Sequence, residues 1–323
     1  MSKPAAVIAI DLPAGLLEDL RRSVTPIVTG PDPAAVDAAL PRAEGILCSA
    51  LLPIDEARLA RAPNLKVIAN FGVGYNNVDL AAATARGIAV CNTPGVLSGA
   101  VADLTIALIL AIARRLFENA AYARGGGWSR REPPPALGWD PAGKTLGIVG
   151  FGRIGQAVAL RARAFGMEVL YHDLVTAPVD GLEDCRPVPL DELLELADVV
   201  SLHVNLDPST HHLIGAAELA RMKPTAWLIN TSRGPVVDQA ALREALASRA
   251  IAGAALDVLD PEPPAADEPL LAMENVIVLP HIGSATVETR AAMRDLAVRN
   301  LVAVLTGRTP PACVNPAVLQ ARP

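Results

Sequence analysis

Three side chains that could carry out chemistry each follow an apolar run typical of a buried strand: Arg233, Glu262 and His281. The carboxyl ends of parallel strands meet at one edge of an open α/β sheet, and ligands bind there. We therefore expect these three side chains to share one face. An arginine binds an anionic carbonyl substrate, an imidazolium protonates the alkoxide that develops, and a carboxylate keeps the imidazole charged. The combination predicts carbonyl reduction beside a nicotinamide.

The other four histidines have simpler explanations. His203 ends an apolar run and is interpreted as a structural histidine, and His172 lies beside Asp173 near an expected adenosine site. His211 and His212 follow a turn sequence, Asp-Pro-Ser-Thr, and are expected to be solvated. His281 is therefore the candidate acid and base.

A glycine-rich fingerprint joins an apolar run at 145–149 to a helical pattern at 153–165. In this context Gly150 allows a tight turn, Gly152 lets a pyrophosphate approach the backbone, and Gly155 lets helix and strand pack closely. Arg153 can add a contact to a phosphate. The sequence thus predicts a dinucleotide-binding turn.

Asp173 ends the next predicted strand, close to the spacing of about 20 residues expected for the acid that binds the adenosine ribose. A carboxylate accepts hydrogen bonds from two ribose hydroxyls and repels a 2′-phosphate. Leu174, Val175 and Thr176 supply no arginine that would neutralise such a phosphate. The sequence predicts NAD as cofactor, with NADP less favoured; the alternative is that Asp173 only terminates a strand.

A second glycine pattern, at 138–145, formally satisfies the phosphate-loop consensus GxxxxGK[ST]. A true phosphate loop follows a strand and opens a helix. Here a proline-rich segment precedes the pattern and a predicted strand follows it, so we do not expect nucleoside triphosphate hydrolysis.

Apolar runs alternate with helical segments along the chain, which predicts parallel βαβ units. In the first hundred residues the expected strands are 5–10, 45–49, 66–70 and 88–92; in the second series they are 145–150, 167–172, 198–203, 226–230, 252–258 and 275–280. One long helix is expected over 99–124 and another over 285–305.

The length of 323 residues suggests two domains, since domains commonly hold about 100–200 residues. We predict an α/β fold of two Rossmann-like or flavodoxin-like domains with parallel sheets and an active-site cleft between them. The substrate domain is expected to comprise 1–98 plus 287–323, and the NAD-binding domain 99–286.

Composition excludes several functional classes. The net charge of −6 and the pI near 5.4 argue against nucleic-acid binding. Charged residues interrupt the longest apolar stretch, 100–116, so no membrane span is expected. We find no secretion signal, and the four cysteines show no metal-ligand or disulfide spacing; they are Cys48, Cys91, Cys185 and Cys313. The protein is expected to be cytoplasmic and to hold no metal.

Five sequence blocks, in this order along the chain, resemble the D-isomer-specific 2-hydroxyacid dehydrogenase family, most closely its glyoxylate/hydroxypyruvate reductase branch. They are NFGVGYNNVD at 70–79, the fingerprint at 150–155, NTSRGPVVD at 230–238, ALDVLDPEP at 255–263 and LPHIGSAT at 279–286. The resemblance covers essentially the whole chain. It implies reduction of a short 2-oxo acid to the D-2-hydroxy acid.

The resemblance also implies individual roles. His281 would be the acid and base, Glu262 its charge partner and Arg233 the group that binds the substrate carboxylate and carbonyl, while backbone amides of Val73 and Gly74 would hold the carboxylate. The implied cofactor residues are Gly150, Gly152, Arg153, Ile154, Gly155, Asp173, Asn205, Thr231, Asp257 and Gly283. Relatives commonly have proline at the position of Asn205, so this contact near the adenine is expected to differ.

Other functions with the same core are weighed against this one. A 3-phosphoglycerate dehydrogenase-like enzyme is less favoured because the chain stops at Pro323 without an appended regulatory domain, and formate dehydrogenase because its long extensions are missing. A dinucleotide-sensing, corepressor-like protein without enzymatic activity is a further alternative. NADH consumption with several 2-oxo acids separates an enzyme from a sensor.

A segment rich in glycine and proline, 125–143, contains Trp128 and Trp139. It resembles the segment through which relatives form dimers around the cofactor domain. We therefore expect a homodimer, against the alternative of a plain surface loop.

Overall fold

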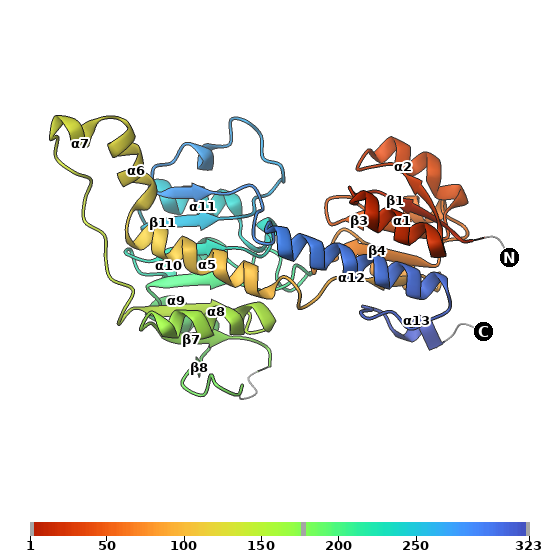
Figure 1. Ribbon diagram of the computed structural model, residues 1–323. Coiled ribbons are helices and arrows are strands. Elements are labelled where there is room, and N and C mark those ends of the chain that lie inside the picture. Colours follow the sequence, from red (N-terminus) through yellow and green to blue (C-terminus); the bar gives the residue numbers. More distant parts are fainter. Residues whose placement is uncertain (1–2, 176–178, 321–323) are drawn as a thin grey trace. The chain divides into compact units, whose positions relative to one another are not determined.

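The computed structural model describes residues 3–175 and 179–320, so Thr176 lies outside the described residues. The chain divides into two compact units, Met1–Leu97 with Thr286–Pro323, and Ser98–Ala285. Each unit is built on one parallel β-sheet flanked by helices (Figure 1). The predicted α/β class with two parallel sheets is confirmed.

The first unit contains a five-stranded sheet in the order β2-β1-β3-β4-β5, which is the flavodoxin-like arrangement. Its strands are β1 (Ala5–Ile8), β2 (Thr25–Val28), β3 (Gly45–Ser49), β4 (Val67–Phe71) and β5 (Ala89–Cys91). Its helices are α1 (Ala14–Ser23), α2 (Pro33–Ala39), α3 (Glu56–Ala60), α4 (Leu80–Ala85), α12 (Val287–Leu305) and α13 (Ala317–Gln320), with a 3-10 turn at Leu40–Arg42.

The longest helix, α12, belongs to this first unit although it comes from the far end of the chain. Its buried side chains Ala297, Leu301 and Val304 share one apolar core with residues of β1, β3, β4 and β5. Thr286 caps the helix by accepting a hydrogen bond from the Thr289 amide. The C-terminal helix thus covers one face of a sheet whose first strand begins at Ala5.

The second unit contains a seven-stranded sheet in the order β12-β11-β10-β9-β6-β7-β8. The strands are β6 (Thr145–Val149), β7 (Glu168–His172), β8 (Arg186–Pro187), β9 (Val199–Leu202), β10 (Trp227–Asn230), β11 (Gly253–Leu256) and β12 (Val276–Val278). The first six have the Rossmann order, and β12 adds a seventh. The strand order reverses between β6 and β9, and this switch point is where a dinucleotide binds in such sheets.

The helices of the second unit are α5 (Ser98–Ala113), α6 (Leu116–Arg124), α7 (Gly127–Arg130), α8 (Arg153–Ala164), α9 (Leu190–Leu196), α10 (Ala216–Arg221) and α11 (Gln239–Ala247). The expected single helix over 99–124 is wrong. Arg115 adopts a left-handed backbone conformation, with φ of 51°, and ends α5 before α6 begins. The glycine-rich segment after α6 contains the short helix α7.

Two strands were not anticipated. The edge strand β2 contains Pro26, a residue that indicates a strand only at a sheet edge. The strand β8 has two residues, which is too short to give a periodic pattern. The phosphate-loop consensus at 138–145 leads directly into β6 and opens no helix, as its context indicated.

Candidate active site

His281 and Glu262 contact each other through a short hydrogen bond between two loops of the second unit. His281 follows β12 and Glu262 follows β11, and His281 Nδ1 lies 2.5 Å from Glu262 Oε1. Both side chains keep partial exposure, 35% and 27% respectively. The carboxylate therefore fixes the orientation of the imidazole ring, and the Nδ1 atom faces Glu262.

Asp257 holds the turn on which His281 stands. The His281 backbone has a φ of 53°, an uncommon conformation for a residue other than glycine. The Asp257 carbonyl accepts a hydrogen bond from the His281 amide at 2.9 Å, and its carboxylate accepts from Ile282 at 2.7 Å and from Gly283 at 2.8 Å. Burial raises the pKa of Asp257, and the two backbone donors oppose that shift. The turn is thus fixed by three bonds to one residue.

Arg233 is positioned by an asparagine at the end of β10. Asn230 is buried; its Oδ1 accepts from the Ser232 amide at 3.0 Å, and its Nδ2 donates to the Arg233 carbonyl at 2.9 Å. Burial lowers the pKa of the Arg233 guanidinium, and the charge of Glu262 acts in the opposite direction. Arg233, Glu262 and His281 therefore occupy the carboxyl ends of the neighbouring strands β10, β11 and β12.

The fingerprint turn has the geometry that a pyrophosphate requires. Gly150 has a φ of +94°, and a Cβ there would lie 2.7 Å from the His203 carbonyl carbon; a Cβ on Gly155 would lie 2.2 Å from the Gly150 oxygen. In contrast, a Cβ on Gly152 would meet nothing within 4 Å. No side chain caps α8, which begins at Arg153, so its N-terminal amides face this open space. The residues fit a bound dinucleotide.

Asp173 lies at the end of β7, beside the fingerprint. Its Oδ2 accepts a hydrogen bond from the Phe151 amide at 2.6 Å, and its Oδ1 accepts from the Val175 amide at 3.1 Å. These bonds orient the carboxylate at the point where an adenosine ribose would lie. Arg153 is exposed and Ile154 is half-buried at the start of α8.

The remaining cofactor candidates lie around the same edge of the sheet. Thr231, after β10, shares a hydrogen bond of 3.2 Å with Thr105 of α5. Asn205, after β9, is exposed, and its carbonyl accepts from the Thr210 hydroxyl at 2.6 Å. A Cβ on Gly283 would approach Asp257 Oδ2 to 3.0 Å, so this position requires a small residue.

His203 is a half-buried histidine that directly follows β9. Its Nε2 lies 2.8 Å from Ser201 Oγ, and within the described chain its buried Nδ1 has no hydrogen-bond partner. Burial lowers the pKa of His203 to about 3. The expected structural role of His203 therefore accounts for Nε2, which pairs with Ser201, but not for Nδ1.

Val73 and Gly74 lie in the first unit, in the loop after β4. Asn92 Nδ2 donates to the Val73 carbonyl at 2.8 Å, and Asn70 Nδ2 donates to the Gly74 carbonyl at 2.7 Å. Among the residues that the structure describes, neither the Val73 amide nor the Gly74 amide donates a hydrogen bond. Adjacent backbone amides without an acceptor are donors of the kind that bind anions.

Three asparagines that organise these loops were not anticipated: Asn70, Asn92 and Asn230. Asn70 is the last residue but one of β4, Asn92 directly follows β5 and Asn230 ends β10. Asn70 and Asn230 are almost fully buried. A polar residue at the carboxyl end of a buried strand is the signal that could have identified them, because a buried amide needs partners.

The described residues contain no group of three or more His, Cys, Asp or Glu side chains that could hold a metal ion. No helix in the described part of the chain is long and apolar enough to cross a membrane.

Comparison with known proteins identifies the family. Residues 106–283 match the family described as D-isomer specific 2-hydroxyacid dehydrogenase, NAD binding domain. A glyoxylate reductase of Korarchaeum cryptofilum is 49% identical over 283 residues, covering 85% of each chain. A glyoxylate/hydroxypyruvate reductase B of Klebsiella pneumoniae is 44% identical over 322 residues, covering 98% of this chain and 99% of the other.

Solved structures agree with this assignment. The NADPH-dependent glyoxylate/hydroxypyruvate reductase of Sinorhizobium meliloti, in complex with NADP and malonate, has a TM-score of 0.88 at 37% identity and covers 97% of each chain. A glyoxylate reductase structure from Paecilomyes thermophila has the same TM-score of 0.88 at 35% identity, covering 97% of this chain and 99% of the other. The chain belongs to the D-isomer-specific 2-hydroxyacid dehydrogenase family, in its glyoxylate/hydroxypyruvate reductase branch.

Proposed function

We propose that this protein uses NADH to reduce a short 2-oxo acid, either glyoxylate to the achiral glycolate or hydroxypyruvate to its D-2-hydroxy acid. The observation that carries the proposal is the 2.5 Å contact between His281 and Glu262, at the strand ends that also present Arg233. A nicotinamide-dependent reductase of glyoxylate-type substrates agrees with the relatives. NADH as the reductant and the roles of the individual residues are parts of this proposal.

In this mechanism His281 is the proton donor. When bound, the reduced nicotinamide supplies a hydride to C2 of the 2-oxo acid. His281 Nε2 donates a proton to the carbonyl oxygen, and Glu262, on Nδ1, stabilises the imidazolium before the transfer. In the reverse direction the neutral imidazole takes the proton from the hydroxyl group.

Arg233 and the loop after β4 are proposed to bind the acid. A guanidinium forms paired hydrogen bonds with a carboxylate and polarises the neighbouring carbonyl. The amides of Val73 and Gly74 would bind the carboxylate as well, because their carbonyls are held by asparagines. Asp257, Thr231 and Gly283 would line the nicotinamide site.

NAD is the proposed cofactor, although the Sinorhizobium meliloti relative is NADPH-dependent. The support is the carboxylate of Asp173, which would repel a 2′-phosphate. Gly150, Gly152, Gly155, Arg153 and Ile154 would hold the pyrophosphate. Asn205 would lie near the adenine.

The test is steady-state kinetics with glyoxylate, hydroxypyruvate, pyruvate and phenylpyruvate, using NADH and NADPH. His281→Gln should lose about 100- to 10,000-fold in kcat while its affinity for NADH, measured by fluorescence titration, stays unchanged. Turnover of the variant at the wild-type rate would remove His281 from the role. Tight NADH binding without turnover of any 2-oxo acid by the wild type would favour the corepressor-like alternative.

A homodimer is also proposed, with α6, α7 and the segment after them as its contact surface. Figure 1 shows α7 projecting from the second unit's sheet. The exposed apolar side chains here are Leu116 at 53%, Phe117 at 55%, Trp128 at 76% and Leu137 at 94%. Exposed apolar side chains gathered in one segment are typical of a protein interface.

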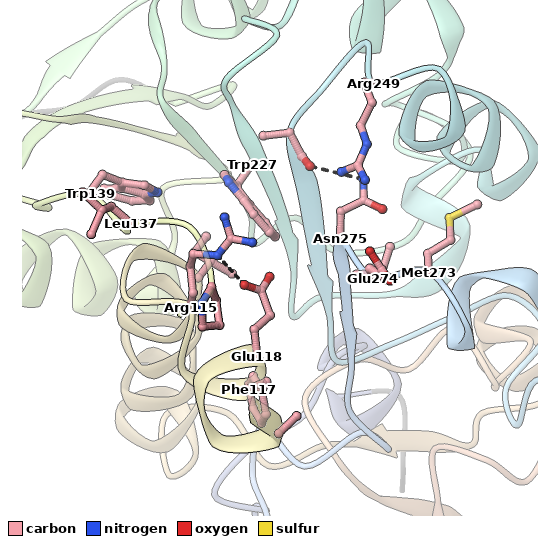
Figure 2. A pocket seen from close by; sticks show the side chains of 15 residues that line it. Arg115, Phe117, Glu118, Leu137, Trp139, Trp227, Arg249, Met273, Glu274 and Asn275 are labelled. Carbon is pink, nitrogen blue, oxygen red and sulfur yellow. Dashed lines mark hydrogen bonds and ion pairs between the residues drawn. The ribbon is translucent and has the colours of Figure 1, made fainter. Parts of the chain in front are cut away.

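A hollow of about 700 Å³ lies next to this segment, lined by Phe117, Leu137, Trp139 and Trp227 among others (Figure 2). Its lining includes Trp227, the first residue of β10, and residues that precede β11 and β12, so it lies at the opposite edge of the sheet from His281. The hollow is therefore separate from the catalytic residues. A second copy of the chain is the proposed occupant, because the apolar side chains continue from the hollow onto α6.

Sedimentation velocity tests the dimer. The wild type should sediment as a dimer, and Trp128→Asp combined with Leu137→Asp should sediment as a monomer. A wild type that stays monomeric at micromolar concentration would contradict the proposal.

A cytoplasmic location is also proposed. It is supported by the four cysteines, all of which are free thiols.

A further inference from the structure

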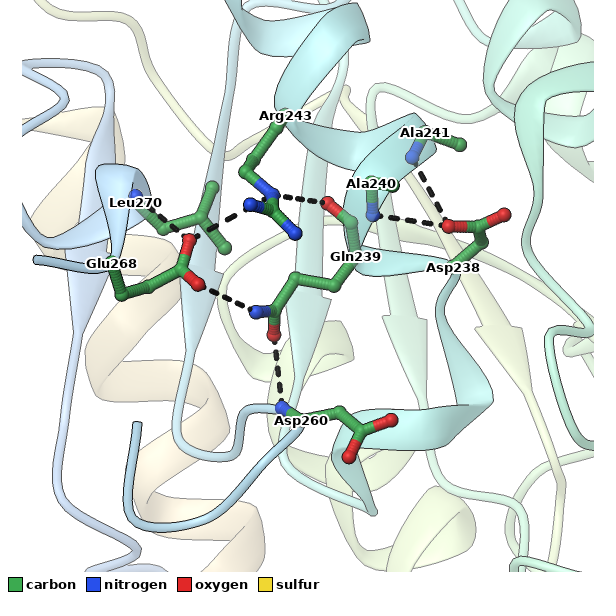
Figure 3. Close-up of polar contacts among 8 residues, drawn as sticks. All are labelled: Asp238, Gln239, Ala240, Ala241, Arg243, Asp260, Glu268 and Leu270. Atoms are coloured by element: carbon green, nitrogen blue, oxygen red, sulfur yellow. Dashed lines mark hydrogen bonds and ion pairs between the residues drawn. The ribbon is translucent and has the colours of Figure 1, made fainter. Parts of the chain in front are cut away.

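The loop that carries Glu262 runs from β11 to a 3-10 turn at Pro269–Leu271, and one side chain outside the loop holds both of its ends. Gln239 Oε1 accepts a hydrogen bond from the Asp260 amide at 2.9 Å, and Gln239 Nε2 donates to Glu268 Oε2 at 2.9 Å (Figure 3). We propose that Gln239 is a positioning residue for the reaction, acting through the Glu262 loop. This inference rests on the proposed function of Glu262 and His281.

Glu268, near the C-terminal end of the loop, is held in place by several contacts. Its side chain is only 8% exposed, and its Oε1 accepts from the Leu270 amide at 3.2 Å and lies 3.8 Å from Arg243 Nε. A carboxylate this buried needs hydrogen-bond donors, because burial of an unpaired charge is costly. Gln239 supplies one donor, and Arg243 supplies a compensating charge.

Gln239 is itself held at the start of α11. Asp238 caps this helix by accepting from the amides of Ala240 and Ala241 at 3.0 and 3.1 Å, and Arg243 Nε donates to the Gln239 carbonyl at 3.2 Å. The amide side chain therefore extends from a fixed backbone position. The loop's bonds connect it to this fixed helix end.

Glutamine suits this position because its amide both accepts and donates. Glutamate at 239 would keep the acceptor for Asp260 but would place a second carboxylate against Glu268. Methionine has a similar length and would remove both bonds. These two substitutions separate loss of one bond from loss of both.

The bonds from Gln239 to the loop should affect the distance between Glu262 and His281. Glu262 is two residues beyond Asp260, and its carboxylate must reach Nδ1 of His281 at 2.5 Å. None of the contacts described for Gln239 involves His281 or Glu262 directly, so any effect on catalysis passes through the loop. Release of the loop should lengthen the contact and weaken the stabilisation of the imidazolium.

The first experiment uses the protein without substrate. The Nδ1 proton of His281, in a short hydrogen bond to a carboxylate, gives a downfield proton NMR signal that is assigned by its loss in His281→Gln. We expect this signal to be lost or strongly broadened in Gln239→Met and weakened in Gln239→Glu. Glu244→Met, an exposed position on the same helix, is the control and should keep the signal.

The second experiment is a double-mutant cycle with glyoxylate and NADH. Gln239→Met should lower kcat by about 10- to 100-fold with little change in the KM for NADH, and should have almost no further effect in a Glu262→Gln background. If Gln239 contributes to stability alone, Gln239→Met should lower Tm and leave the NMR signal unchanged. The effects of Gln239→Met and Glu262→Gln on kcat should then be additive.

The outcomes separate the two proposals. If Gln239→Met folds and keeps both the signal and kcat, the positioning role is overturned while the proposed function stands. If the wild type reduces no 2-oxo acid, the proposed function fails, and the NMR experiment still decides whether Gln239 holds Glu262 against His281.

Discussion

Gly234 lies so close to Leu259 that a Cβ added to the glycine would be 2.0 Å from the Leu259 carbonyl oxygen and 2.2 Å from its carbonyl carbon. Gly234 directly follows Arg233, and Leu259 belongs to the loop after β11 that carries Glu262. The backbones of the loops that carry Arg233 and Glu262 are therefore in direct contact. The spacing between these two residues depends on the absence of a side chain at Gly234.

Gly234→Ala should force these loops apart, because backbone atoms cannot yield as a flexible side chain does. We expect a loss of about 1–3 kcal/mol in the free energy of unfolding and a larger relative loss in kcat/KM for glyoxylate. Chemical denaturation and steady-state kinetics measure the two effects. Gly15→Ala is the control, since a Cβ there meets nothing within 4 Å; equal behaviour of both variants would contradict the argument.

Asn92→Ala should weaken binding of the acid. It removes the donor that holds the Val73 carbonyl at 2.8 Å, so the amides of Val73 and Gly74 lose their fixed direction. The lost bond is worth about 0.5–1.5 kcal/mol, which predicts a rise of several-fold in the KM for glyoxylate. Affinity for NADH should not change. Asn64→Ala, at an exposed position of the same unit, should leave both values at the wild-type level.

Asp173→Asn tests the cofactor preference. Asparagine keeps an oxygen that can accept from the Phe151 amide, now at 2.6 Å, but it removes the charge that would repel a 2′-phosphate. The ratio of kcat/KM with NADPH to that with NADH should rise by about tenfold, equivalent to 1.4 kcal/mol. A wild type that already uses both cofactors equally would disprove the role given to this carboxylate.

His203 predicts how stability depends on pH. Its folded-state pKa is about 3, whereas an unperturbed histidine titrates near pH 6.5. The unfolded chain therefore takes up the proton first, so the contribution of neutral His203 is complete above pH 6.5 and is lost as pH falls towards 3. The loss is about 1.4 kcal/mol per pH unit.

His203→Gln should remove this part of the slope when the free energy of unfolding is measured between pH 7 and pH 4.5. His211→Gln, at an exposed position, should keep the wild-type slope. The comparison uses slopes, so a uniform destabilisation of either variant does not affect it. If His203→Gln keeps the wild-type slope, a group other than His203 causes the pH dependence of the free energy of unfolding.

Much of the fold could be predicted because most strands are continuous apolar runs. The six expected strands of the second unit all form, and so does the helix that follows the fingerprint. The pattern failed where local conformation overrides it. Pro26 made the edge strand β2 unrecognisable as a strand, and the left-handed backbone of Arg115 divides the single helix expected over 99–124.

The site could be predicted less completely, for a physical reason. Residue types and strand ends indicate Arg233, Glu262 and His281 as candidates. The contacts that hold them, such as Asn230 on Arg233 and Gln239 on Asp260, depend on which loops meet in space. Spacing along the chain cannot give such contacts, since Gln239 and Asp260 are hydrogen-bonded although they lie 21 positions apart in the sequence.

The place of α12 has a consequence for how the protein is made. Its side chains complete the core beneath strands that the ribosome releases first, while residues 98–285 emerge in between. At about 5–20 residues per second, the sheet of the first unit waits tens of seconds for its last covering layer. The middle of the chain can fold during synthesis, whereas the first unit can finish only after the C-terminal helix has left the ribosome. Truncation before α12 should therefore leave the N-terminal strands as a target for chaperones and proteases.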